Sequence, residues 1–182
     1  RSGARMKALL EDLVEFNRTR LGLGIRIAPA SADLATVFAD ELEDLRAAHP
    51  NRQLHLDAAG DTQGMWDGRR LQQVLGNLVL NAIKYGAADT PVRVAVSGGD
   101  SDVRFEVRNT GPVIAQSILD RIFDPLMRAP EHEHRGPGDG SLGLGLYIAH
   151  EIVRAHRGKI EARSENTETV FAVRLPRDRE RA

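Results

Sequence analysis

The sequence predicts an α/β protein: a two-layer α/β sandwich with a mixed, mainly antiparallel sheet and an additional helix at the N-terminus. Strand-like segments follow helical ones and the chain closes with an antiparallel pair, which is typical of helices layered on one face of a sheet. The length of 182 residues suits one domain with a short appendage. The hydrophobic fraction of 41% and the charged fraction of 28% are those of a globular protein, which excludes disorder along the whole chain.

The first element is a charged helix over residues 5–20. Its apolar residues recur alternately three and four positions apart, the spacing of a helix seam. They are Met6, Leu9, Leu13 and Phe16, and the seam is widened by Leu10 and Val14. Two interpretations stay open: a surface helix packed on its own domain, or half of a helical hairpin or dimer stem whose mate lies outside this chain. The opening residues, RSGARM, look like a cut inside a longer polypeptide, so we expect a fragment.

The next segment, residues 21–66, is expected to hold a weak strand, a helix and an edge strand. The weak strand lies at 25–28, after a glycine-rich break. The helix covers 33–48, with Asp33 as its N-cap. Residues 53–57 alternate apolar and polar side chains, as an edge strand does.

The second half of the chain continues with helices and strands. In order, we expect a helix at 67–86, strands at 92–97 and 103–108, a short helix at 115–122, a loop at 128–140, a helix at 144–157, and strands at 159–163 and 169–175. Gly98 and Gly99 predict a tight turn between the first two strands. The glycines and prolines of the loop predict a mobile lid. The sheet face opposite these helices is expected to be open or to carry the N-terminal helix.

Composition excludes several classes of function. The 25 Lys and Arg residues against 26 Asp and Glu leave a formal net charge of -1, which argues against binding nucleic acid by bulk charge. Cysteine is absent, so the sequence offers no disulfide, thiolate metal site or cysteine nucleophile. No apolar run approaches the roughly 18 residues that span a bilayer, and we expect a soluble, cytoplasmic chain.

The most informative segment is the helix at 71–86, LQQVLGNLVLNAIKYG. One of its stripes is apolar and faces the core. A second stripe carries Asn77, Asn81, Lys84 and Tyr85, because positions three and four apart share a helix face. An amide oxygen suits Mg²⁺, a lysine neutralises phosphate, and a tyrosine ring can cover a base. The alternative interpretation is a solvated helix face.

Three segments elsewhere in the chain are further candidates for binding a ligand. Gly143 and Gly145 precede a helix whose first amide hydrogens have no intrahelical partner, and glycine lets an anion approach that backbone. An ordinary junction between loop and helix is the alternative. The strand ending in VRNTGPVI turns at Gly111, and the segment RIFDPLMR places an aromatic residue and an arginine just before the lid.

Taken together in this order, these segments resemble the ATP-binding catalytic domain of bacterial sensor histidine kinases, in the ATPase superfamily of gyrase, heat-shock chaperones, histidine kinases and MutL. The asparagine box of the family corresponds to 71–86, the first glycine box to 109–114, the phenylalanine box to 123–128 and the second glycine box to 141–146. The resemblance covers nearly the whole chain. It implies a Bergerat-type ATP-binding fold with ATP and Mg²⁺ as cofactors.

The resemblance also implies roles for single residues. Asn81 would bind magnesium, Asn77 and Lys84 would face the phosphates, and these three would carry catalysis. Tyr85 would pack near the adenine. The implied nucleotide-binding residues are Asn77, Asn81, Lys84, Tyr85, Asn109, Gly111, Ile114, Arg128, Leu142, Gly143, Leu144, Gly145 and Leu146.

The implied organisation is the second helix of a dimerisation stem at 1–24, the catalytic domain at 25–176 and a disordered tail at 177–182. The domain would transfer the γ-phosphate of ATP to a histidine on a stem helix that is not present in this chain. That helix would belong to the same or the partner subunit of a homodimer, and the phosphate would pass to the receiver domain of a response regulator. The first of the six histidines is His49, beyond the stem, so we expect no acceptor and no self-phosphorylation here. No nucleic-acid partner is implied.

Departures at single positions bear on the alternatives. The family usually has aspartate at the position of Asn109, where the carboxylate accepts a hydrogen bond from the adenine amino group. We therefore expect intact ATP binding that is weaker by about 1 kcal/mol. Hydrolysing relatives carry glutamate at the position of Asn77, and an amide cannot act as a general base, which favours transfer over hydrolysis. A nucleotide-free docking module and a related ATPase or serine kinase are the remaining alternatives.

Overall fold

The computed structural model describes residues 2–127 and 143–177. The predicted lid over 128–140 and the side chains at 2–5, 7–9 and 11 lie outside this description. In chain order the helices and strands are α1 (Ser2–Arg20), β1 (Ala30–Asp33), α2 (Leu34–Ala48), β2 (Leu54–Ala59), β3 (Gln63–Trp66), α3 (Gly68–Tyr85), β4 (Val92–Gly98), β5 (Asp102–Thr110), α4 (Gln116–Leu119), α5 (Gly145–Ala155), β6 (Lys159–Glu165) and β7 (Glu168–Pro176).

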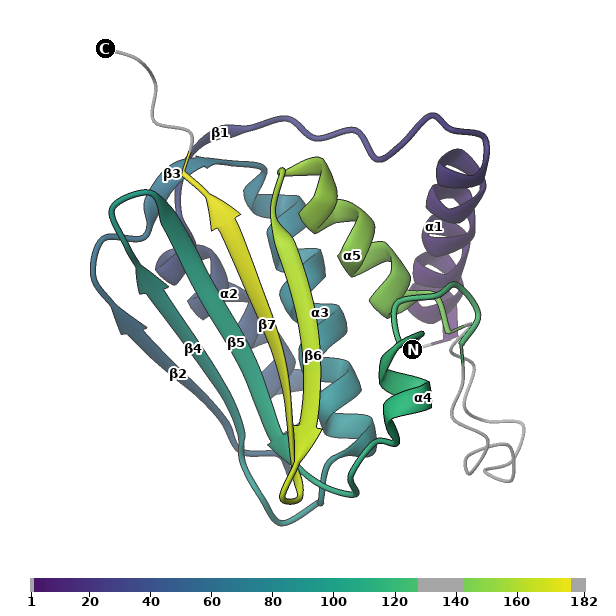
Figure 1. The fold of residues 1–182 in the computed structure, drawn as a ribbon, viewed down its shortest axis with the longest axis vertical. Helices are drawn as coiled ribbons and strands as arrows, with labels where there is room; N and C mark the ends of the chain where they lie inside the picture. The colour runs from purple at the N-terminus through teal and green to yellow at the C-terminus, as the bar shows by residue number, and fades with distance from the viewer. Residues whose placement is uncertain (1, 128–142, 178–182) are drawn as a thin grey trace.

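The main sheet has five strands in the order β2-β4-β5-β7-β6. β2 runs parallel to β4, and the other neighbouring strands pair antiparallel. Figure 1 shows β7 between β5 and β6, with β2 at the opposite edge. The prediction of a mixed, mainly antiparallel sheet is therefore confirmed, and so is the placement of β2 at an edge.

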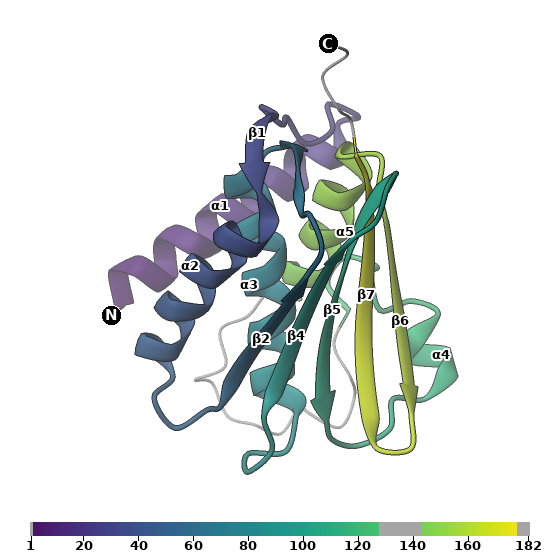
Figure 2. The ribbon, with the colours of Figure 1, turned by 90° about the vertical axis from the view of Figure 1, so that its left-hand side faces the viewer.

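Helices α2, α3 and α5 cover one face of this sheet, and the two layers are separated clearly in Figure 2. The strands bury alternate residues against the helices, as the pleat of a sheet requires. In β5, Val103, Phe105 and Val107 are buried, whereas Arg104 between them is exposed. Phe105 meets Phe38 of α2 edge to face, with ring centroids 4.7 Å apart. The core of the domain lies between these two layers.

The helix α1 packs on α5, at the outer side of the helical layer (Figures 1 and 2). The sheet face opposite the helices was predicted either to be open or to carry the N-terminal helix, and α1 does not lie on it. The outward positions of the strands carry exposed charged residues such as Arg93, Arg104 and Arg174. Such positions offer little apolar surface to a helix seam, which explains why α1 lies against the helical layer.

One predicted strand is wrong and another strand was missed. Residues 25–28 form no strand; instead the N–H of Ala28 donates to Oδ2 of Asp67, 2.8 Å away. The strand begins later, as β1, and pairs antiparallel with the missed strand β3. Both are short, and the sequence of β1, ASAD, has no apolar alternation. Their pairing depends on a partner more than thirty residues away.

The ends of α2 and α3 follow local signals. Asp33 caps α2, as predicted, and accepts a hydrogen bond from the N–H of Ala35. Asp67 caps α3 in the same way and accepts from the N–H of Arg70, while Gly86 ends the helix. Within 2–127 and 143–177, no helix is both long and apolar enough to cross a membrane.

Candidate functional site

The helix α3 separates its apolar and polar residues onto two sides. Leu71, Leu75 and Leu78 are fully buried against the core. The second side carries the predicted polar stripe, and its members are partly buried: Asn77, Asn81, Lys84 and Tyr85. The amphipathic spacing places the stripe beside the core and not within it, so these polar groups stay within reach of a ligand.

Asn77 joins α3 to the start of α5. Its Nδ2 donates a hydrogen bond to the carbonyl oxygen of Gly145, 2.9 Å away. A Cβ atom at Gly145 would lie 3.4 Å from Cγ and Oδ1 of Asn77, in van der Waals contact, so the start of α5 lies directly against this amide. The amide of Asn77 therefore positions the N-terminus of α5.

Lys84 and Tyr85 lie together at the C-terminal end of the stripe. The Lys84 Nζ is 4.9 Å from the centroid of the Tyr85 ring, which is a cation–π distance. A phosphate near this end of the helix would meet an ammonium group, and a planar base would meet an aromatic ring.

Asn81 lies one turn after Asn77 on the same side. Its partly buried side-chain amide makes no hydrogen bond to any other residue of the described ranges. Those ranges also contain no group of three or more His, Cys, Asp or Glu residues arranged to hold a metal. An amide oxygen is a hard ligand, and Mg²⁺ is commonly held by few protein ligands together with phosphate oxygens. The chemistry of Asn81 fits that pattern.

The end of β5 comes close to the end of α3. A Cβ atom at Gly111 would lie 2.9 Å from the carbonyl oxygen of Tyr85, and one at Gly86 would lie 3.0 Å from Nδ2 of Asn109. Asn109 is buried, with 6% of its surface exposed. The fold thus brings the end of α3, at Tyr85 and Gly86, against Asn109 and Gly111, which follow more than twenty positions later in the sequence. The N–H of Ile114 nearby donates to Oγ of Ser164 at 3.0 Å.

Gly143, two residues before α5, lies against the backbone of Leu126 and Met127. Gly143 has φ of 70°, and a Cβ atom there would lie 2.8 Å from the carbonyl oxygen of Met127. Leu144, at the N-cap position of α5, makes no side-chain capping hydrogen bond and is buried, whereas Leu146 is partly buried. The first turn of α5 therefore has no side-chain cap. Two predicted binding residues, Arg128 and Leu142, lie outside the described residues.

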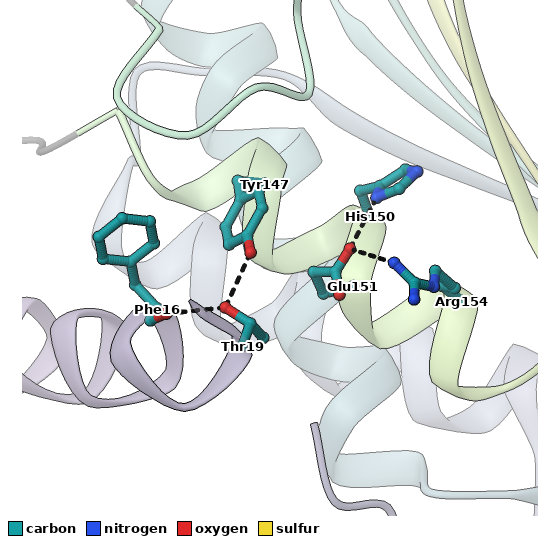
Figure 3. Close-up of polar contacts among 6 residues, drawn as sticks. All are labelled: Phe16, Thr19, Tyr147, His150, Glu151 and Arg154. Carbon is teal, nitrogen blue, oxygen red and sulfur yellow. Dashed lines mark hydrogen bonds and ion pairs between the residues drawn. The ribbon is translucent and has the colours of Figure 1, made fainter. Parts of the chain in front are cut away.

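A contact that the sequence did not predict joins α1 to α5 (Figure 3). The Tyr147 hydroxyl donates to Oγ1 of Thr19 at 2.8 Å, and the Tyr147 ring meets Phe16 edge to face at 5.8 Å. An ion pair between Glu15 and Arg70, 2.8 Å long, joins α1 to α3. The apolar seam of α1 indicated that it needs a partner, but no local pattern pointed to Tyr147.

Two histidines of the described ranges, both near α5, take up structural positions. His156 is buried; its Nε2 accepts from the N–H of Asp67 at 3.1 Å, and its Nδ1 faces the carbonyl oxygen of Ile152 at 2.9 Å. His150 stacks on Phe123, with centroids 5.5 Å apart. Predicted lid histidines, His132 and His134, lie outside the described residues.

Residues 66–179 match the sequence model of the family described as histidine kinase-, DNA gyrase B-, and HSP90-like ATPase. The chain belongs to this family of ATPases. The signal transduction histidine-protein kinase AfsQ2 of Streptomyces coelicolor is 36% identical over 180 residues, which are 96% of this chain and 31% of that protein. Within the family, the chain is the ATP-binding catalytic domain of a two-component sensor histidine kinase.

Solved structures agree with the fold. Full-length ShkA in complex with AMPPNP is 26% identical with a TM-score of 0.78, over 97% of this chain and 36% of that one. The histidine kinase ThkA in complex with the response regulator protein TrrA is 22% identical with a TM-score of 0.74, over 100% of this chain and 50% of that one. The chain spans 24% to 36% of the length of three curated relatives that it matches.

Proposed function

We propose that this domain binds Mg²⁺ and ATP against the polar stripe of α3 and transfers the γ-phosphate to a histidine on a stem helix outside this chain. The observation that carries the proposal is the amide of Asn81, which is partly buried on the stripe and makes no hydrogen bond to another described residue. A polar group in that position is costly unless a ligand or solvent meets it. A magnesium ion bound to phosphate oxygens satisfies it.

The other residues divide into two groups in this proposal. Near the phosphates, Asn81 ligates the metal, Lys84 neutralises charge, and Asn77 positions the first turn of α5. Backbone groups of the turn before and at the start of α5 surround the phosphates: Leu142, Gly143, Leu144, Gly145 and Leu146. Arg128, outside the described residues, is assigned to binding the γ-phosphate. At the other end, the base is bound by Tyr85, Asn109, Gly111 and Ile114.

Catalysis in this proposal comes from positioning and charge neutralisation, as is general in phosphoryl transfer. Magnesium supplies neutralisation of the phosphate oxygens when bound. Asn77 occupies the helix position where a general base would activate water, and its amide is both unable to take a proton and committed to Gly145. The arrangement therefore favours transfer to a protein side chain over hydrolysis.

The rest of the proposal concerns how the chain is divided and which partners it works with. Residues 1–24, which include α1, act as the second helix of a dimerisation stem, residues 25–176 form the catalytic unit, and 177–182 are a tail. The acceptor histidine comes from the first stem helix of the same or the partner subunit of a homodimer. A response regulator receives the phosphate, nucleic acid plays no part, and the domain works in the cytoplasm, where ATP is supplied.

Thermal unfolding with a non-hydrolysable ATP analogue tests the proposal. At ligand about a hundredfold above its dissociation constant, linkage predicts about 2.7 kcal/mol of stabilisation, in the presence of Mg²⁺. Asn81→Ala abolishes most of this gain, whereas Asn17→Ala, an exposed asparagine on α1, leaves it unchanged. A magnesium-independent shift that survives Asn81→Ala contradicts the proposed site.

A labelling experiment with [γ-³²P]ATP tests the missing acceptor. The chain alone stays unlabelled, because no histidine of the described ranges lies on α1. Strong self-labelling that is stable in alkali and lost in acid contradicts the proposed acceptor. Steady release of inorganic phosphate without a protein acceptor favours an ATPase instead.

A further inference from the structure

The amide of Asn109 is free to present either of its two hydrogen-bonding atoms to a ligand. We propose that Asn109 relaxes the purine selectivity of the site, so that a six-oxo purine nucleoside triphosphate binds as well as ATP. This inference rests on the proposed function, because it takes the end of β5 as the place where the base binds.

The surroundings of Asn109 do not lock its amide in one orientation. The residue is 6% exposed, yet its side chain has no hydrogen-bond partner among the residues of 2–127 and 143–177. Its cross-strand neighbour is Thr169, which is also buried, but the Thr169 hydroxyl bonds to Oγ of Ser164 at 3.0 Å. That hydroxyl of Ser164 in turn accepts from the N–H of Ile114. The hydroxyl groups of Thr169 and Ser164 are therefore bonded to each other and not to Asn109.

Two glycines leave room for the amide to turn. A Cβ atom at Gly86 would lie 3.0 Å from Nδ2 of Asn109, and one at Gly111 would lie 3.6 Å from the same atom. Because neither residue has a Cβ, the amide group is not held by side chains from these two directions. Rotation about the last side-chain torsion of asparagine has two broad minima, which exchange the positions of oxygen and nitrogen.

The chemistry of purines matches this exchange. Adenine presents its six-amino group as a donor beside the acceptor N1, whereas hypoxanthine and guanine present the six-oxo group as an acceptor beside N1–H. An asparagine amide carries one acceptor and a pair of donor hydrogens, so one orientation fits adenine and the reversed orientation fits a six-oxo purine. An aspartate carboxylate has acceptors alone and would face the six-oxo group with like partial charge.

Calorimetry with the non-hydrolysable imido analogues of ATP and ITP, both with Mg²⁺, tests the inference. Hypoxanthine differs from adenine in the six position and N1 and lacks the two-amino group of guanine, so the comparison isolates those atoms. The two analogues are expected to bind the wild-type chain within about tenfold of each other. Asn109→Asp is expected to raise the preference for the ATP analogue by about tenfold or more. Asn17→Asp makes the same charge change at an exposed position of α1 and leaves the preference unchanged.

The outcomes separate this inference from the proposed function. If neither analogue binds, the proposed function fails and the inference fails with it. If the ATP analogue binds and the ITP analogue is more than about a hundredfold weaker on the wild-type chain, the inference alone is overturned. The wild-type ratio decides this even if Asn109→Asp unfolds, and an unchanged ratio in a folded Asn109→Asp variant also overturns it.

Discussion

The two sides of α3 differ in packing and in chemistry. On the side toward the core, Leu71, Leu75 and Leu78 have no exposed surface. On the other side, Asn77 and Asn81 are partly buried, and only Asn77 has a hydrogen-bond partner among the described residues. The comparison shows that a single helix stabilises the fold with one side and keeps polar side chains partly exposed on the other. Asn77 is tolerated there because its amide is paired, and Asn81 because its side chain stays partly exposed.

The largest expected effect comes from damage to the core side. Leu78→Ala deletes a fully buried side chain and is expected to lower the free energy of unfolding by about 2–5 kcal/mol. Leu80→Ala, on the same helix but 43% exposed, is the matched control and is expected to cost about 1 kcal/mol or less. Denaturant unfolding followed by the fluorescence of Trp66, the single tryptophan of the sequence, measures both. Equal losses of unfolding free energy in the two variants would contradict the difference in burial between Leu78 and Leu80.

Asn77→Ala is expected to have the next largest effect, and it changes a residue on the polar side of α3. It removes the hydrogen bond to the carbonyl oxygen of Gly145, which stabilises the fold by about 0.5–1.5 kcal/mol. Because that bond positions α5, nucleotide affinity falls as well, in titrations with the ATP analogue. Gln72→Ala, on the same helix, is expected to change neither quantity by more than about 0.5 kcal/mol. Loss of stability with unchanged affinity would show that Asn77 acts on the fold alone.

Tyr147→Phe extends the comparison to α5, which borders the polar side of α3. It removes the hydrogen bond to Thr19 and keeps the ring contact with Phe16, with an expected loss of about 0.5–1 kcal/mol. Hydrogen exchange is expected to quicken in α1 and to stay unchanged in the sheet. A double-mutant cycle with Thr19→Val checks the pairing. Additive effects of the two substitutions would mean that the hydroxyl groups do not interact.

Glu41→Gln is expected to have the smallest effect. Burial, with a further contribution from Asp44, raises the pKa of Glu41 above its ordinary 4.5. Because the folded pKa is the higher one, the stabilising contribution is present below pH 4.5 and is lost as the pH rises through the folded pKa. Glu41→Gln therefore raises the free energy of unfolding at neutral pH by less than about 1 kcal/mol, measured through a higher midpoint of thermal unfolding, and the gain vanishes in acid.

The control for Glu41→Gln is Glu43→Gln, at an exposed position of the same helix, which is expected to change nothing. A gain for Glu41→Gln that persists unchanged in acid would show that burial of the charge is not its cause. Oε1 of Glu41 lies 2.8 Å from the position of a Cβ atom at Gly76, on the part of α3 that faces α2. The substitution thus probes the contact between α2 and α3.

Much of the fold was predictable because its signals are local. The caps of α2 and the alternation of β4 and β5 depend on residues within a few positions of one another. The segment at 25–28 was wrongly predicted as a strand because a weak alternation cannot distinguish an extended coil from a strand that has a partner. β3 was missed for the converse reason, since its four residues, QGMW, form a strand through their pairing with β1.

In the candidate site, too, some features were predictable from local sequence and others were not. The polar stripe of α3 was predictable from spacing alone, because positions three and four apart always share a helix face. The meeting of Asn109 with Gly86 and Gly111 was not, because it requires the end of α3 and the turn after β5 to be brought together by the sheet.

By itself, the sequence determined the amphipathic helices, most of the strand pattern and the polar stripe proposed to hold a metal-bound phosphate, since short-range periodicity and side-chain chemistry are sufficient for these. The tertiary structure alone decided which atoms meet. The bond from Asn77 to Gly145 joins residues 68 positions apart, and the bond from Tyr147 to Thr19 joins residues 128 positions apart. No local preference selects such contacts, because each exists only after the sheet has formed and the helices have packed upon it.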